Sequence, residues 1–258
     1  GFASLPGSPA AGSLAATVPV VEPAFGAAMP ERFGTDVDAD GLLDMPNNAG
    51  YVQGCPAGCR GPARFTLRLD ASASRARLGE HPLAISGYRW RVLGPDGLVA
   101  ARSTAAPQVE FRLPEGTYRV TLDARADLGW ATATARVERE VTVEDLLVVA
   151  VGDSYASGDG NPEEPRGSAG GTAAWGDSPG DAAAEADHAA AHRSTAAWPA
   201  LVALALERGD PGSSVTFVSL AATGARVGRD LVPVAASGGE TGQLGRVADE
   251  VQARERGR

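Results

Sequence analysis

Short segments in which apolar and polar residues alternate constrain the fold most. Between residues 64 and 143 they read FTLRLDA, YRWRVLG, QVEFRLP, GTYRVTLDA and ATARVEREVTV. Alternation with period two places one face of a segment against a core and the other in water, as in a half-buried β-strand. Turn signals such as Gly94-Pro95-Asp96-Gly97 and Pro114-Glu115-Gly116 separate the segments. Strands at this regular spacing predict a β-sandwich.

The pattern changes at Glu144. Residues 146–151, LLVVAV, form a continuous apolar run that is too short for a typical helix and fits a strand buried on both faces of a parallel sheet. A helix is expected at 194–208, a second buried strand at 215–220 (VTFVSL) and a second helix at 241–255. The order strand, helix, strand, helix predicts half of a doubly wound α/β domain.

Helical spacing predicts which side of each helix is buried. The first helix is expected to begin near Pro199, since proline suits a first turn. The residues expected on its apolar face are Trp198, Leu201, Leu204 and Ala205. Those expected on the second helix are Leu244, Val247 and Val251.

These patterns predict a mixed fold, a β-sandwich followed by an α/β domain with parallel strands. Residues 1–32 are rich in Ala, Gly, Pro and Ser and are expected to be a flexible segment. Residues 33–62 are expected to be an acidic linker, residues 63–144 the sandwich and residues 145–258 the α/β part. The net charge of −9, from 32 acidic and 23 basic residues, argues against a nucleic-acid partner. Since no uncharged apolar run of about 18 residues occurs, no membrane span is expected.

A serine follows the first buried strand in VVAVGDSYASGDGNP, residues 148–162. Gly152 relieves crowding at the turn, and the hydroxyl of Ser154 is expected to face the carboxyl edge of the sheet, where open α/β proteins bind ligands. This is not the G-x-S-x-G elbow, since Ala156 stands two positions after Ser154. Considered alone, the segment fits an ordinary turn as well as a nucleophile site.

Two further blocks add context to Gly152-Asp153-Ser154-Tyr155-Ala156-Ser157-Gly158. His192-Arg193-Ser194 precedes a Trp-Pro helix, and Ala221-Ala222-Thr223-Gly224-Ala225 follows the second strand. In this order the blocks resemble the SGNH, or GDSL-type, serine hydrolases, in particular secreted actinobacterial-type esterases and lipases. The resemblance implies that Ser154 is the nucleophile, supported by Gly152 and Asp153 in its block. It also implies that the N–H groups of Ser154 and Gly224 form part of the oxyanion hole.

The same resemblance identifies what is missing. The family adds an Asn donor from a Gly-x-Asn-Asp block and a base from a late Asp-x-x-His block, and the chain reaches Arg258 before either. An esterase domain that is incomplete in this chain is therefore expected. Neither His188 nor His192 is predicted to be the base, and His192 is expected to be a structural or pocket-edge residue. His81 is expected in an exposed loop.

Alternating carboxylates precede the sandwich. Such a pattern, closed by a glycine turn, can place oxygen ligands around Ca²⁺. The candidate ligands are Asp36, Asp38, Asp40, Leu42 through its carbonyl, and Asp44. The loop resembles the calcium loops of thrombospondin type 3 repeats, and a solvated acidic turn is the alternative. The expected role of Ca²⁺ is structural, and no cofactor is expected for catalysis.

Residues 67–143 resemble a PKD-type, immunoglobulin-like module, with LDASAS near the start and LPEGTYRVTLDA later. Trp90 is expected to pack between the sheets, and Tyr118 to be a core or corner residue. Cys55 and Cys59 can form a small disulfide or remain thiols, and the sequence leaves both open.

The function expected from these features is a secreted serine hydrolase acting on a small-molecule or lipid ester, with the sandwich as an accessory module. The alternative is a non-catalytic, calcium-stabilised extracellular binding or adhesion protein. The sequence predicts neither the substrate nor an oligomeric state.

Overall fold

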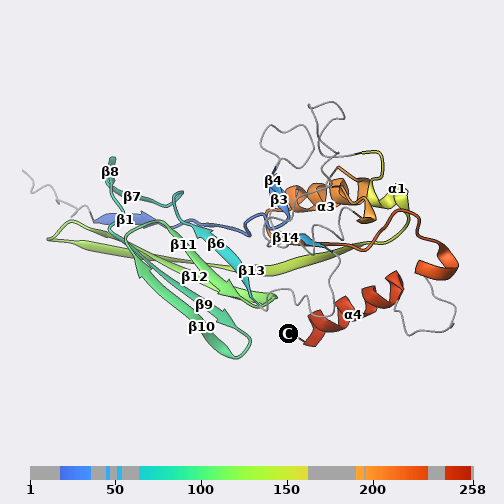
Figure 1. The fold of residues 1–258 in the computed structure, drawn as a ribbon. Helices are drawn as coiled ribbons and strands as arrows, with labels where there is room; N and C mark the ends of the chain where they lie inside the picture. The colour runs from blue at the N-terminus through green and yellow to red at the C-terminus, as the bar shows by residue number, and fades with distance from the viewer. Residues whose placement is uncertain are drawn as a thin grey trace, which may run out of the picture.

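The computed structural model describes residues 18–35, 45–46, 51–53, 64–161, 190–194, 196–231 and 242–256. This part of the chain is mostly β-sheet, with mixed sheets and few helices (Figure 1). The strands are β1 (Pro19–Glu22), β2 (Gly26–Ala28), β3 (Gly34–Thr35), β4 (Met45–Pro46), β5 (Tyr51–Gln53), β6 (Phe65–Asp70), β7 (Arg75–Leu78), β8 (His81–Leu83), β9 (Gly87–Gly94), β10 (Gly97–Thr104), β11 (Gln108–Leu113), β12 (Gly116–Asp127), β13 (Thr132–Ala150) and β14 (Ser213–Ser219). The helical elements are α1 (Ser154–Ser157), α3 (Trp198–Gly209), the π-helical turn η1 (Val227–Leu231) and α4 (Gln243–Arg256).

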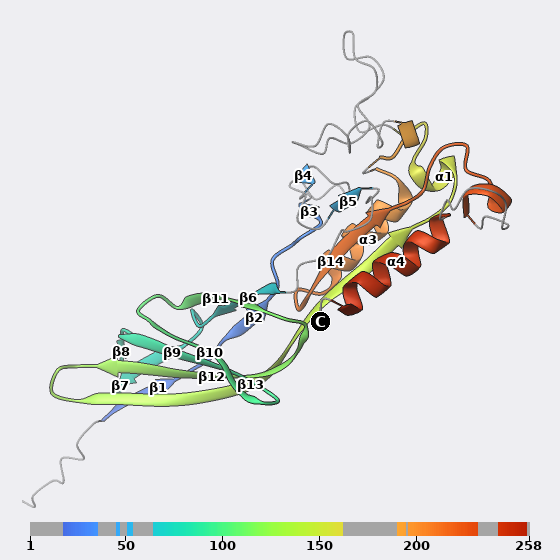
Figure 2. The same cartoon turned by 60° about the horizontal axis from the view of Figure 1, so that its bottom comes forward.

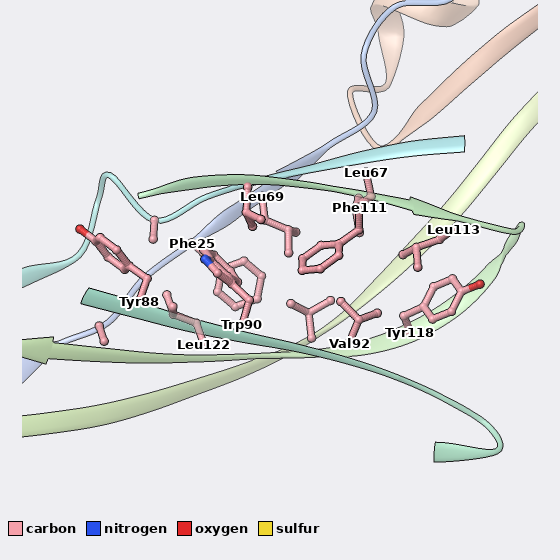
Figure 3. Close-up of a cluster of buried hydrophobic side chains, with 14 of the residues drawn as sticks. Phe25, Leu67, Leu69, Tyr88, Trp90, Val92, Phe111, Leu113, Tyr118 and Leu122 are labelled. Atoms are coloured by element: carbon pink, nitrogen blue, oxygen red, sulfur yellow. The ribbon is translucent and has the colours of Figure 1, made fainter. Parts of the chain in front are cut away.

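Two sheets enclose the larger hydrophobic core. The order β11-β6-β2 forms one sheet, and β10-β9-β12-β13 forms most of the facing one. Their inward residues alternate with outward ones and meet between the layers (Figure 3). Trp90 is fully buried there, and the ring of Phe25 meets it edge-on at 5.3 Å between centroids. The arrangement is consistent with the expected β-sandwich.

The two aromatic residues singled out in the sequence lie where they were expected. Trp90 packs between the sheets, and Tyr118 is buried on the neighbouring strand β12. The hydroxyl of Tyr118 donates a hydrogen bond to the carbonyl of Pro114 at 2.9 Å. Tyr118 therefore buries its ring in the core and satisfies its polar end at the corner before its own strand.

Residues 18–32, the described part of the stretch predicted to be flexible, form strands and pack against the core. Strand β1 pairs with β7, and β2 pairs with β6. Phe25, between β1 and β2, is buried against the core, and its carbonyl accepts a hydrogen bond from Arg139 at 2.8 Å. A few apolar residues, including Val21 and Met29, are enough to hold this Ala- and Pro-rich segment in place.

Strand β13 joins the two parts of the chain without a break (Figure 1). Its antiparallel pairing with β12 ends at Val143, opposite Gly116. Its parallel pairing with β14 begins at the next residue, Glu144, opposite Ser213. The change of pattern at Glu144 therefore marks a change of partner within one strand.

The parallel strands extend the same sheet, in the order β13-β14-β5. All seven residues of β14 are buried, as predicted for a strand covered on both faces. Helices α3 and α4 lie on opposite sides of β13 and β14 (Figures 1 and 2). Strand β5 also pairs with β14 in parallel. A part of the predicted 33–62 linker is thus a strand of the sheet.

The buried face of α3 differs from the predicted one. Helix α3 begins at Trp198 with proline in its first turn, as expected. Trp198 is half-exposed, however, and the buried face consists of Pro199, Ala200, Ala203, Leu204 and Glu207. Ala200, Ala203 and Leu204 pack in one buried cluster with residues of β14. On α4, Leu244 and Val251 remain exposed.

Hydrogen bonds to backbone N–H groups explain why the acidic residue Glu207 lies on the buried face of α3. Its carboxylate accepts hydrogen bonds from the backbone N–H groups of Arg32 at 2.7 Å, Phe33 at 3.0 Å and Val215 at 3.0 Å. Burial raises the pKa of Glu207, and these backbone hydrogen bonds oppose the increase. The side chain thereby attaches the N-terminal segment to α3 and β14.

A second buried carboxylate, Asp145, lies where β13 changes partner. It accepts hydrogen bonds from the hydroxyls of Ser214 at 2.7 Å and Thr216 at 2.6 Å. Arg254 of α4 is 3.1 Å from the same carboxylate and 3.0 Å from Glu115 of the sandwich. This network connects the sandwich to the helical part.

Candidate functional site

Residues 152–158, which the sequence predicts to carry the nucleophile and which are called the nucleophile turn below, follow the carboxyl end of β13. Asp153 caps the short helix α1, and its side chain accepts a hydrogen bond from the N–H of Tyr155 at 3.1 Å. Gly158 ends the helix in the left-handed region, with its N–H donating to the carbonyl of Ser154 at 3.1 Å. Ser154 therefore lies at the end of a parallel strand, where the sequence pattern placed it.

Two positions in this turn require glycine. Gly152 has a φ of 142°, and a Cβ there would lie 2.8 Å from the Cβ of Ala156. Gly158 has a φ of 92°, and a Cβ there would lie 2.8 Å from the Cβ of Ala197. Other residues would strain the backbone and displace α1 or the segment before α3.

The Gly224 loop, residues 220–225, leaves β14 beside this turn. The N–H groups of Leu220 and Ala221 donate to the carbonyl of Ala150 at 2.8 and 3.1 Å. The N–H of Ala222 reaches the carbonyl of Gly152 at 3.3 Å. Neighbouring parallel strands thus bring together two sequence blocks that lie far apart along the chain.

Neither of the two proposed oxyanion donors is occupied. Among the described residues, the N–H groups of Ser154 and Gly224 have no hydrogen-bond acceptor. The hydroxyl of Ser154 has no side-chain partner in the same part of the structure. The site therefore presents a serine and two amide donors, without a base bonded to the serine.

The His192-Arg193-Ser194 block connects the turn to the loop. Arg193 is buried, and its Nε donates to the carbonyl of Ala221 at 2.8 Å. The N–H of Ser194 donates to the carbonyl of Ser157 at 2.9 Å. His192 has a φ of 51°, unusual for a residue with a side chain.

Asp159 is the acidic residue in this arrangement that sequence reasoning missed. One carboxylate oxygen lies 3.1 Å from Nδ1 of His192, and the other accepts a hydrogen bond from the hydroxyl of Thr223 at 2.8 Å. Its position in the Gly-Asp-Gly sequence just after the nucleophile turn was the available signal, since such acids often bond within turns.

Gln243 is the second functional candidate that was missed. Its side-chain oxygen accepts the N–H of Gly152 at 2.7 Å, and its side-chain nitrogen donates to the carbonyl of Gly152 at 2.9 Å. The amide thus pairs with the backbone of the nucleophile turn from the first residue of α4. Nothing in the sequence marks Gln243, because its role depends entirely on where α4 begins in space.

Several predicted residues lie outside the described part of the chain. They are Asp36, Asp38, Asp40, Leu42, Asp44, Cys55, Cys59 and His188. The calcium loop and the disulfide therefore stay predictions. Within the described ranges, no group of three or more His, Cys, Asp or Glu side chains could hold a metal ion. His81 is exposed on β8, in the sandwich.

Comparison with known proteins adds no identification. No protein-family profile, curated protein or solved structure matches the chain. Across the described residues, no helix combines the length and apolarity needed to cross a bilayer. The fold defines the class only coarsely, as a mostly β protein with mixed sheets.

Proposed function

We propose that this chain carries the nucleophile part of a serine ester hydrolase of the SGNH type, acting through an acyl-serine intermediate. One arrangement supports the proposal most. The nucleophile turn and the Gly224 loop meet at the carboxyl ends of adjacent parallel strands, and the N–H groups of Ser154 and Gly224 are left without acceptors. This is the combination of nucleophile and preorganised donors that acyl transfer requires.

The proposed reaction has two steps. Oγ of Ser154 bonds to the carbonyl carbon of the ester, the bond to the alcohol oxygen breaks, and the serine proton leaves with the alcohol. Water then bonds to the acyl carbon, the bond to Oγ breaks, and a water proton returns to Ser154 as the acid leaves. The N–H groups of Ser154 and Gly224 would stabilise the oxyanion in both steps, at about 3 kcal/mol each.

The proton acceptor is the part of this mechanism that the sequence does not supply. The SGNH resemblance assigns it to an Asp-x-x-His block, and that spacing does not occur in the 258 residues. In serine proteases that lack a triad member, the oxyanion hole and substrate binding retain about 10³–10⁴-fold catalysis over water. The reaction proposed here therefore assigns the nucleophile and two amide donors to residues of this sequence, and assigns the proton acceptor to none of them.

Labelling with a fluorophosphonate tests the assignment. The probe reacts by forming an Oγ–P bond while the P–F bond breaks, and fluoride leaves with the serine proton. Prolonged incubation should add one phosphonyl group, which peptide mass spectrometry locates on Ser154. Ser154→Ala should abolish the adduct, and Ser103→Ala, at an exposed serine of β10, should not. Equal labelling of Ser154→Ala would remove Ser154 from the role.

The substrate class in this proposal is a small-molecule or lipid ester, and the PKD-like sandwich is an accessory module of a secreted protein. The acidic loop is proposed to bind a structural Ca²⁺ through Asp36, Asp38 and Asp40, with Leu42 and Asp44 completing the set. Calorimetric titration with Ca²⁺ should release or absorb heat with the wild type and not with Asp38→Asn. No heat with the folded wild type would remove the metal from the proposal.

A non-catalytic, calcium-stabilised binding or adhesion protein is the second candidate. The observation that favours it is the hydroxyl of Ser154, which has no hydrogen-bonded base in the described structure. This candidate predicts no fluorophosphonate adduct on Ser154 at any probe concentration. The labelling experiment therefore separates the two.

A further inference from the structure

We infer that Asp159 is a positioning residue that holds the Gly224 loop against the nucleophile turn. The inference rests on the proposed function for its catalytic consequence. Asp159 follows the turn directly, and its own N–H donates to the carbonyl of Ser154 at 3.0 Å. Its backbone is thus bonded to Ser154, and its side chain reaches other segments.

The carboxylate of Asp159 uses both oxygens to reach those segments. One lies 3.1 Å from Nδ1 of His192, and the other accepts the hydroxyl of Thr223 at 2.8 Å. Thr223 directly precedes Gly224, so the second bond acts one residue away from the proposed oxyanion donor. Asp159 therefore joins the nucleophile turn, the His192 segment and the Gly224 loop at one point.

Backbone and side-chain hydrogen bonds together hold the Gly224 loop. The backbone hydrogen bonds between the loop and the turn become longer along the loop, from 2.8 Å at Leu220 to 3.3 Å at Ala222. Gly224 has a φ of 73°, and a Cβ added there would meet no atom within 4 Å. The N–H of Thr223 donates to the carbonyl of Ala191 at 3.0 Å, and the hydroxyl of Thr223 adds the side-chain bond to Asp159 at 2.8 Å.

Removing the Asp159 side chain should affect the reactivity of Ser154 more than it affects the stability of the fold. The side chains of Asp159 and His192 are 37% and 41% exposed. Because water can solvate the groups left behind, removing this pair should change the free energy of unfolding only slightly. An oxyanion donor, by contrast, must lie within about 0.5 Å of its productive position. Loss of the attachment should therefore lower the rate of phosphonylation while leaving the unfolding midpoint nearly unchanged.

Three variants test this: Asp159→Ala, Thr223→Val and the double variant. Each is compared with Asp127→Ala, which removes an exposed turn carboxylate from the distant tip of the β12–β13 hairpin. The readouts are the maximal fluorophosphonate labelling rate, the probe concentration at half-maximal rate, and hydrogen exchange of residues 219–226. Asp159→Asn, which retains an acceptor for Thr223, serves as the conservative variant.

We expect Asp159→Ala and Thr223→Val to lower the maximal rate about 10- to 100-fold, a part of the 10²–10³-fold effect of losing a donor entirely. The half-maximal concentration should change little, and exchange in the loop should become faster. The double variant should be no slower than Asp159→Ala, because both changes remove the same bond. Asp159→Asn should recover part of the rate.

Unchanged labelling and exchange in Asp159→Ala, with Ser154 labelled in the wild type, would overturn the positioning role and leave the proposed function intact. No labelling of the wild type would overturn the proposed function instead. In that case hydrogen exchange decides the inference: faster exchange in both single variants supports the attachment, and unchanged exchange refutes it.

Discussion

Replacing Glu207 with alanine should destabilise the fold strongly. The carboxylate is 3% exposed and accepts the N–H groups of Arg32, Phe33, Gly34 and Val215. Alanine would leave these four donors without their acceptor. At about 1 kcal/mol for each unsatisfied N–H group, the loss is about 4 kcal/mol. Such a loss is a large fraction of the 5–15 kcal/mol, roughly, that stabilises an ordinary domain.

Urea unfolding followed by circular dichroism measures this loss. The matched control is Glu138→Ala, which removes a surface carboxylate paired with Arg119 at 3.4 Å and should cost about 0–1 kcal/mol. A loss in Glu207→Ala no larger than in Glu138→Ala would refute the claim that Glu207 attaches the N-terminal segment to α3 and β14.

Three further outcomes are expected. Gly152→Ala should slow labelling of the nucleophile more than Gly160→Ala does, since both have positive φ but only at Gly152 would a Cβ meet another atom, 2.8 Å away. Equal rates would contradict this. Trp90→Ala should cost about 3–5 kcal/mol in urea unfolding, because it empties the centre of the sandwich core. A loss below about 1 kcal/mol would show that Trp90 is not central. The pKa of Asp123 is lowered chiefly by a hydrogen bond from an arginine of β13, so its stabilisation is complete above the ordinary carboxyl pKa and lost as pH falls through the lowered value. Asp123→Asn should flatten that acidic loss of stability, and an unchanged pH dependence would contradict it.

The sandwich strands and the parallel pair were predictable because their pattern is local. Alternation with period two identified β6, β9, β11 and β12, and a continuous apolar run identified β14. The change at Glu144 was also visible, because a strand paired in a half-exposed sheet and one buried on both faces need different residues. What the pattern could not show is that β13 is one strand, paired with β12 in its first part and with β14 in its last part, within a single sheet.

The errors arose where a distant partner decides the outcome. Helix α3 buries Glu207 rather than Trp198 because backbone N–H groups of the N-terminal segment converge on that carboxylate. In the candidate site, the turn that holds Ser154 and the loop that holds Gly224 follow β13 and β14, as the short sequence blocks predicted, and the catalytic roles of both residues stay predictions. Asp159 and Gln243 could not be assigned roles, because their partners are Thr223 and Gly152, which only the folded chain brings near.

A crystal structure of the phosphonylated chain would show whether Ser154 and the two amide donors form one site. We expect a phosphonyl group on Oγ of Ser154, with its oxygen about 2.7–3.1 Å from the N–H nitrogens of both Ser154 and Gly224. An adduct on another residue would contradict the proposed function. So would an adduct on Ser154 whose phosphonyl oxygen points into solvent and away from Gly224.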